Sequence, residues 1–277
     1  MQRILTIQDI SCIGKCSLTV ALPIISACGI ETAILPTAVL STHTAFKGFT
    51  FRDLTDDLDS IINHWKDLKM GFDAVYTGYL GSFRQLDIVS NCFDDFKTKG
   101  NFILVDPVMA DNGKLYVGFD ENFAKSMAKL CAKADVIVPN LTEASFMLGT
   151  EYIAYGYDEN YIKDLLKKLT ALGSKIAVLT GVAFDDDTLG AYAYDSEKDE
   201  YFYYKREKLP VSFHGTGDVF ASALLGALTI GKGIEDGIKI AVDFTVQAIK
   251  ETMLNPEHVW YGVEFEKAIP SLIDSLK

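Results

Sequence analysis

Alternation between short apolar runs and longer amphipathic runs constrains the fold of this chain most. Runs of strand length occupy residues 3–8, 30–35, 73–77, 102–105, 135–138 and 175–179. Helical patterns lie at residues 18–28, 53–69, 82–97, 120–133, 157–172, from 218 onward, 234–253 and 264–276. Strands joined through helices make right-handed crossovers and lie parallel. We therefore predict an α/β fold in three layers, with a doubly wound, mainly parallel sheet and helices on both faces.

Three stretches add detail to this pattern. Residues 188–208 alternate aromatic and charged side chains around a polar turn, which predicts a small antiparallel hairpin near the C-terminal third. Residues 36–50 are rich in hydroxyl groups and are predicted as a loop, with either a structural role or a ligand contact. Ser17 is placed to act as the N-cap of the helix at residues 18–28.

Composition limits the class of protein. The 277 residues are 49% hydrophobic, which suffices for one large domain spanning residues 1–277. A net charge of -12 without a Lys/Arg cluster argues against a nucleic-acid partner. Five cysteines without CxxC spacing argue against a disulfide framework or a zinc site. Because no signal peptide or membrane-length apolar stretch is present, we expect a cytoplasmic protein without membrane contact.

The stretch Gly215-Thr216-Gly217-Asp218 precedes a buried helical run and has the features of an anion site. Glycines let an anion approach the backbone closely, and the first N–H groups of a helix have no partner within it. Asp218 adds a carboxylate that could accept a proton. A simpler interpretation is a turn followed by an ordinary helix-start residue.

Polar residues follow three of the predicted strands. Asp106 and Asp111 follow the first strand, Asn140 and Glu143 the second, and Thr180 the third. In a parallel sheet these strand ends meet at one edge, where open α/β sheets bind ligands. Each residue also has a structural explanation, since Asp106 precedes a proline and Asn140 with Glu143 matches a helix capping pattern. The acidic run at residues 185–187 is interpreted as a solvated loop.

No Walker motif and no protein-kinase signature set is present, which disfavours those ATP-binding classes. Four motifs nevertheless resemble the ribokinase-like kinases, and among them the pyridoxal (vitamin B6) kinases, across essentially the whole chain. These motifs are Thr77-Gly78-Tyr79-Leu80-Gly81, Asp106-Pro107-Val108-Met109, Pro139-Asn140-Leu141-Thr142-Glu143 and Gly215-Thr216-Gly217-Asp218. The resemblance implies ATP-dependent phosphorylation of the 5′-hydroxymethyl group of pyridoxal, pyridoxamine or pyridoxine, in salvage of the cofactor.

The resemblance also assigns roles to residues. Asp218 would be the general base, and the N–H groups of Gly215, Thr216 and Gly217 would stabilise the transferred phosphoryl group. Mg²⁺ would be positioned by Glu143, Asn140 and Asp106, and K⁺ would lie near Asp106, Thr180 and the carbonyl of Val138. Contacts with ATP would come from Asp106, Asp111, Asn140, Thr180 and Thr216. The family also tends to form homodimers.

On the substrate side, the resemblance places His43 and Thr44 in the loop that binds the vitamer, with Tyr79 and Tyr116 flanking its ring. Asp9 stands where pyridoxal kinases usually have a serine over the ring. The loop that follows keeps Gly14 but then reads Lys15-Cys16-Ser17, one residue shorter than in the family. Asp9 would then either bind a charged vitamer such as pyridoxamine or hold the loop. The preferred vitamer therefore stays open.

Three other functions also stay open. Hydroxymethylpyrimidine (phosphate) kinases of thiamine synthesis are related, but they usually carry a cysteine where this chain has Asp218. Sugar and nucleoside kinases of the superfamily usually have an extra lid and a longer N-terminal glycine-rich region, neither of which is visible here. A vitamer-binding protein without catalysis would be expected to lack the base, and Asp218 argues against it.

Overall fold

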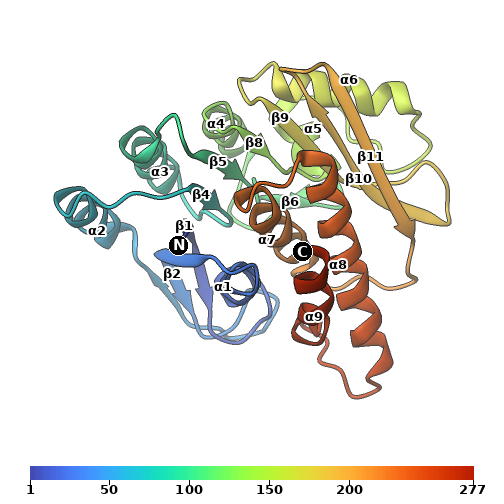
Figure 1. Cartoon of the computed structure of the whole chain (residues 1–277), viewed down its shortest axis with the longest axis horizontal. Helices are drawn as coiled ribbons and strands as arrows, with labels where there is room; N and C mark the ends of the chain where they lie inside the picture. The colour runs from blue at the N-terminus through green and yellow to red at the C-terminus, as the bar shows by residue number, and fades with distance from the viewer. The chain divides into compact units, whose positions relative to one another are not determined.

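The computed structural model describes residues 1–277, which form two compact units (Figure 1). Unit 1 comprises Met1–Gly78 and Leu209–Lys277, and unit 2 comprises Tyr79–Lys208. The expectation of a single domain over residues 1–277 stays a prediction. No helix combines the length and the apolarity needed to cross a membrane.

The sheet of unit 1 has the strand order β4-β1-β2-β3. β1 (Arg3–Ser11) pairs in parallel with β2 (Glu31–Leu40) and with β4 (Ala74–Thr77), and β3 (Phe51–Asp53) adds antiparallel to β2. The central strand β1 is almost entirely buried, as expected for a parallel strand covered on both faces.

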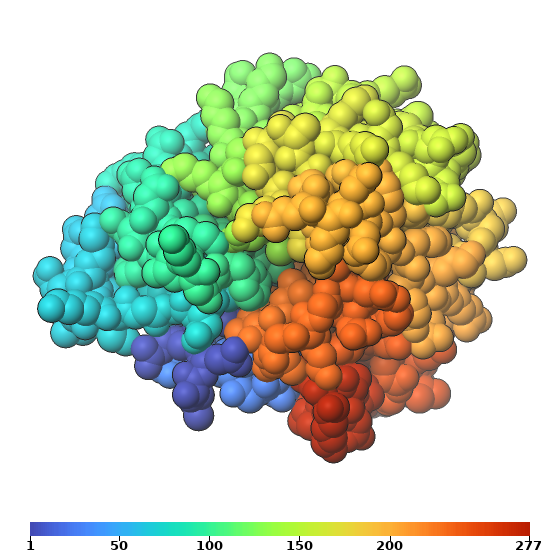
Figure 2. Space-filling model, turned by 45° about the horizontal axis from the view of Figure 1, so that its top comes forward, coloured from blue at the N-terminus to red at the C-terminus, as the bar shows by residue number.

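Five helices belong to unit 1: α1 (Leu18–Ala27), α2 (Thr55–Asp67), α7 (Thr216–Thr229), α8 (Ile234–Leu254) and α9 (Phe265–Ser275). α7 packs between α1 and α8, and α9 lies along α8. In Figure 2 the dark red residues of the C-terminal helix lie against the orange helices of the same unit. Almost every side chain of α7 is buried, which fixes the position of its N-terminus.

Unit 2 has the strand order β11-β10-β9-β8-β5. β5 (Phe102–Val105), β8 (Val136–Ile137) and β9 (Ile176–Val182) are parallel, whereas β10 (Thr188–Asp195) and β11 (Glu200–Glu207) form an antiparallel hairpin beside β9. The hairpin predicted at residues 188–208 and the mainly parallel α/β class are therefore confirmed. The remaining elements are α3 (Phe83–Phe96), α4 (Glu121–Cys131), α5 (Leu141–Leu148), α6 (Glu159–Thr170) and a small hairpin of β6 (Ala110–Asp111) and β7 (Lys114–Leu115).

Two predictions about local structure were wrong. Residues 36–40 continue β2 instead of beginning a loop. Pro36 has no N–H to donate, but it pairs with Gln8, where the register of β1 and β2 shifts, so the strand tolerates it. Ser17 precedes α1 but makes no side-chain cap, since its φ of 52° and ψ of -134° turn the backbone away from capping geometry. The helix α5 was anticipated only through its capping pattern.

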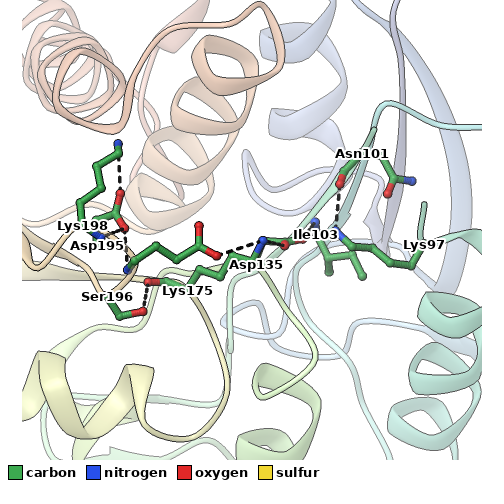
Figure 3. Close-up of polar contacts among 9 residues, drawn as sticks. Lys97, Asn101, Ile103, Asp135, Lys175, Asp195, Ser196 and Lys198 are labelled. Carbon is green, nitrogen blue, oxygen red and sulfur yellow. Dashed lines mark hydrogen bonds and ion pairs between the residues drawn. The ribbon is translucent and has the colours of Figure 1, made fainter. Parts of the chain in front are cut away.

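Asp135 connects the amino ends of three strands in unit 2 (Figure 3). Its Oδ2 accepts the Ile103 N–H of β5 at 2.8 Å and pairs with the Lys97 ammonium. Its Oδ1 lies 3.5 Å from Lys175 Nζ, and its carbonyl accepts the Ile176 N–H of β9 at 2.9 Å. Because this network lies at the amino ends of the strands, away from the polar strand ends described below, its role is structural.

Asp135→Ala should lower the free energy of unfolding by about 2 kcal/mol, because it leaves the Ile103 N–H without its acceptor and the Lys97 ammonium with only the Asn101 carbonyl. The Asp135 side chain is only 16% exposed. The matched control is Asp94→Ala, which removes an ion pair with Lys133 whose acid is 67% exposed and should change stability by less than about 0.5 kcal/mol. Equal effects of the two substitutions in urea unfolding would contradict the structural role of Asp135.

Candidate active site

The N-terminus of α7 is shaped by Gly215. This residue has a φ of 81°, and a Cβ built on it would lie 2.1 Å from the Lys15 carbonyl oxygen, so only glycine is compatible with the position. The first helical hydrogen bond runs from the Val219 N–H to the Gly215 carbonyl at 3.1 Å. The earlier N–H groups therefore have no partner within the helix, and the space beside Gly217 is open. This helix end can receive an anion.

Asp218 lies in the first turn of α7 and is half-buried. Desolvation raises the pKa of its carboxyl to about 7, and the negative charge of Asp9 acts in the same direction. A hydrogen bond from the Ser17 backbone N–H opposes them by favouring the ionised form. The result is a carboxylate that can accept a proton near neutral pH and lies beside unpaired N–H groups, which suits proton abstraction from a hydroxyl during phosphoryl transfer.

Ser17 is therefore connected to the site, although the sequence suggested only a cap. It donates its N–H towards Asp218, and its hydroxyl hydrogen-bonds to the carboxyl of Asp9. The positive φ of Ser17 is unusual for a residue with a side chain, and this is the signal that marks it. Backbone conformation of this kind depends on distant contacts and is not visible in local sequence.

Asp9 is buried near the end of β1, with 4% exposure. Its Oδ2 accepts a hydrogen bond from the Ser11 hydroxyl at 3.0 Å. Burial raises the pKa of this carboxyl, while the bonds from Ser17 and Ser11 and the charge of His214 lower it. These contacts agree with the loop-holding role for Asp9, and its predicted contact with the substrate stays a prediction.

His43 is also buried in unit 1, whereas the neighbouring Thr44 is exposed. His43 Nδ1 accepts the Ala45 N–H at 3.2 Å, and its ring lies 4.5 Å from the ring of His214. Burial and the charge of His214 lower the pKa of His43, and a hydrogen bond with the Tyr261 backbone opposes them. The sequence analysis missed His214, although its position directly before Gly215 could have indicated it.

In unit 2 the structure brings together three of the predicted strand-end residues. Asp106 follows β5 directly and is buried. Asn140 forms a parallel bridge with Thr180, and the Thr180 N–H donates to the Pro139 carbonyl at 3.0 Å. The Val138 N–H donates to the Val105 carbonyl at 3.0 Å, which places the ends of β5, β8 and β9 side by side. The carboxyl ends of these strands therefore meet at one edge of the sheet in this unit, as predicted.

Asn140 and Glu143 form a complete capping box at the start of α5. The Glu143 N–H donates to Asn140 Oδ1 at 2.9 Å, the Asn140 N–H donates to Glu143 Oε2 at 2.9 Å, and the Met109 N–H donates to Glu143 Oε1 at 3.2 Å. Desolvation raises the pKa of the Glu143 carboxyl, and the charge of Asp111 adds to this. No charged partner for Glu143 is present, so a nearby cation would favour its ionised form.

The chain contains no group of three or more His, Cys, Asp or Glu side chains arranged to hold a metal ion. Mg²⁺ often uses only one or two carboxylates and fills its other positions with water and phosphate oxygens, so Glu143 is compatible with this ion. Backbone N–H groups of Asn140, Met109 and Ala110 bond to the Glu143 carboxylate. Of its roughly four lone-pair positions, these bonds leave one for another partner.

Asp111 is the last residue of β6, and Tyr116 directly follows β7. Asp111 is exposed and accepts the Asn112 N–H at 2.8 Å, in a turn in which Asn112 and Gly113 both have positive φ. The Tyr116 N–H donates to the Met109 carbonyl at 2.8 Å, and its side chain is exposed. Tyr79 packs its ring 5.7 Å from that of Phe119. Their contacts with nucleotide or substrate stay predictions.

Comparison with known proteins agrees with this geometry. The phosphomethylpyrimidine kinase family profile matches residues 31–262. A pyridoxal kinase from Dictyostelium discoideum is 29% identical over 240 residues, covering 81% of this chain and 77% of its own.

Two crystal structures are similar over nearly the full length. A protein from Bacteroides thetaiotaomicron assigned as a phosphomethylpyrimidine kinase, in a crystal form with pyridoxal, is 40% identical with a TM-score of 0.93, covering 98% of this chain and 95% of its own. Pyridoxal kinase from Lactobacillus plantarum is 30% identical with a TM-score of 0.91, covering 99% and 97%. The chain is therefore a kinase of the ribokinase-like class. It belongs to the phosphomethylpyrimidine kinase family, whose profile it matches, and it is also similar to pyridoxal kinases.

Proposed function

We propose that this protein transfers the γ-phosphoryl group of ATP to the 5′-hydroxymethyl oxygen of a B6 vitamer. The observation that carries the proposal is Asp218, a half-buried carboxylate with a pKa of about 7 at the open N-terminus of α7. The similarity to a structure crystallised with pyridoxal and to named pyridoxal kinases supports a B6 vitamer as the acceptor.

The residues of unit 1 account for the reaction step. Asp218 takes the proton of the hydroxymethyl group as its oxygen bonds to the γ-phosphorus, and the bond from phosphorus to the ADP oxygen breaks. The N–H groups of Gly215, Thr216 and Gly217 stabilise the charge on the transferred phosphoryl oxygens, since they are already oriented before the reaction. A general base of this kind contributes about a hundred- to ten-thousand-fold in rate.

The residues of unit 2 are proposed to contact the nucleotide and its cation. Asp106, Asn140 and Thr180 share one edge of the sheet, and the buried carboxylate of Glu143 is the proposed ligand of Mg²⁺ or of its bound water. Bound Mg²⁺ would neutralise phosphate charge. A K⁺ ion near Asp106, a homodimer and a cytoplasmic location stay predictions.

The proposal is tested by measuring ADP release with pyridoxal, pyridoxamine, pyridoxine and hydroxymethylpyrimidine. At least one B6 vitamer should be phosphorylated more efficiently than hydroxymethylpyrimidine. Asp218→Asn should reduce turnover by about a hundredfold or more while the affinity for ATP changes only a few-fold, because the base acts on the alcohol. Preference for hydroxymethylpyrimidine would instead assign the protein to thiamine synthesis, and the absence of turnover with any substrate would favour a binding protein.

Asp236→Asn, an exposed first-turn aspartate of α8, is the matched control and should leave turnover unchanged. The stability of Asp218→Asn is compared with that of wild type at pH 8, to show that the variant is folded. The native pKa of Asp218 lies above the unfolded value of 3.8, so stability falls as the pH rises from about 4 to about 7. Asp218→Asn should therefore be at least as stable as wild type at pH 8. Near-normal turnover of a folded Asp218→Asn protein would remove Asp218 from the mechanism.

Glu143→Ala should raise the Mg²⁺ concentration needed for half-maximal rate several-fold, because it removes an oxygen that binds the ion or orients its water. Glu121→Ala serves as the control, since Glu121 is an exposed first-turn acid of α4 in the same unit. An unchanged Mg²⁺ titration in Glu143→Ala would leave Glu143 with the capping role alone.

Asp9→Ser should shift the ratio of kcat/KM values from pyridoxamine towards pyridoxal, because a carboxylate near the substrate can accept a charge-assisted hydrogen bond from an aminomethyl group. A bond of this strength corresponds to a several-fold to roughly tenfold preference. In wild type, pyridoxamine should be used at least as well as pyridoxal. An equal ratio in wild type and Asp9→Ser would show that Asp9 holds the loop through Ser11 and does not select the vitamer.

A further inference from the structure

Two residues with positive φ lie close together in the loop that connects β1 to α1. Lys15 has a φ of 49° and Ser17 a φ of 52°, and neither is a glycine. Such conformations persist only where surrounding contacts impose them, and they are often found at functional sites.

The loop is held from the C-terminal side by Lys15. Its Nζ lies 2.6 Å from both carboxylate oxygens of Glu266 in α9 and 5.2 Å above the ring of Phe265. Gly262 accommodates the Lys15 side chain, because a Cβ there would lie 2.4 Å from Lys15 Cβ. We call the Lys15–Glu266 ion pair with the Gly262 contact the Lys15 clamp. Glu266 is half-exposed and Lys15 less so.

The other side of the loop meets the proposed site. The Lys15 carbonyl packs against Gly215, the residue that shapes the N-terminus of α7. The His43 N–H donates to the Ile13 carbonyl at 3.1 Å, and Gly14 lies directly against the His43 ring. Two residues after the clamp, Ser17 presents its N–H to Asp218. A continuous series of contacts therefore links Glu266 of α9, through the loop, to the carboxyl of Asp218.

We propose that Lys15 is a positioning residue: through its ion pair with Glu266, it holds the loop at residues 13–17 in the conformation in which the Ser17 N–H is directed at Asp218. The proposal rests on the function proposed above for Asp218, and it assigns a role to the part of the loop that departs from related kinases. The C-terminal helix α9, which carries no residue of the reaction, takes part through Glu266.

Loss of the Lys15 clamp should change the pH dependence of Asp218. The charged or titratable groups that act on Asp218 are Asp9 of β1 and Cys16 of the loop, and burial holds the pKa of the Cys16 thiol at about 12. Lys15 itself directs its charge to Glu266. Loss of the clamp would therefore act on Asp218 mainly by removing the Ser17 hydrogen bond. Since that bond favours the carboxylate, its loss raises the pKa of Asp218 and moves the titration to higher pH.

The test uses Lys15→Met, which keeps the packing on Gly262 but removes the charge, and Glu266→Gln, which removes the opposite charge. The ¹³C NMR signal of the Asp218 carboxyl, assigned with Asp218→Asn, is titrated in each full-length protein without substrate. In both variants its midpoint should rise by about one pH unit relative to wild type. Lys15→Arg, which can restore the ion pair, should titrate close to wild type.

Kinetics supply the second readout. In Lys15→Met and Glu266→Gln, kcat should fall about tenfold with an unchanged KM for ATP, and the acid side of the rate profile should move with the NMR midpoint. Lys239→Met removes an exposed ion pair with Glu235 on α8 and should change neither readout.

An unchanged Asp218 midpoint in both folded clamp variants would overturn the proposal whatever the activity of the wild type. Failure of the proposed function would appear differently, as wild-type protein that binds but does not phosphorylate any vitamer while the NMR midpoint still responds to the clamp.

Discussion

The proposed chemistry of this protein depends on the burial of one carboxyl group. Asp218 sits in the first turn of a helix, where the helix dipole and a hydrogen bond from Ser17 both favour its ionised form. Desolvation outweighs them and raises the pKa to about 7. The same position thus supplies an oriented anion site and a group able to take up a proton at neutral pH, which are the two requirements of phosphoryl transfer to an alcohol.

This arrangement has a cost in stability that the surrounding structure must offset. The raised pKa of Asp218 lowers the stability of the native state as the pH rises from about 4 to about 7, and the loop beside it contains two residues with positive φ. The offset comes from burial: α7 packs nearly all of its side chains against α1 and α8. Natural proteins often place such strain at functional sites supported by a well-packed framework.

The class of fold, the hairpin and several site residues could be predicted from the sequence, because neighbouring residues along the chain determine them. The alternation of strands and helices gave the class of fold, and the aromatic alternation at residues 188–208 gave the hairpin. The Gly-Thr-Gly-Asp stretch and the strand-end residues Asp106, Asn140 and Thr180 also lie where the pattern placed them. What failed depends on long-range contacts. The strand through Pro36 needs a register shift with its neighbour, and Lys15, two residues before Ser17, contacts Gly215 and Gly262, two hundred or more positions away.

The pH dependence of kcat/KM for the preferred vitamer tests the central claim most directly, because it reports the ionisation of the essential base in the enzyme form that the vitamer binds. With saturating ATP and Mg²⁺, the wild-type profile should fall on the acid side with a midpoint near pH 7, the value set by the burial of Asp218. A profile that stays flat down to about pH 5 would show that an ordinary, solvated carboxylate or no base at all accepts the proton, and would contradict this account.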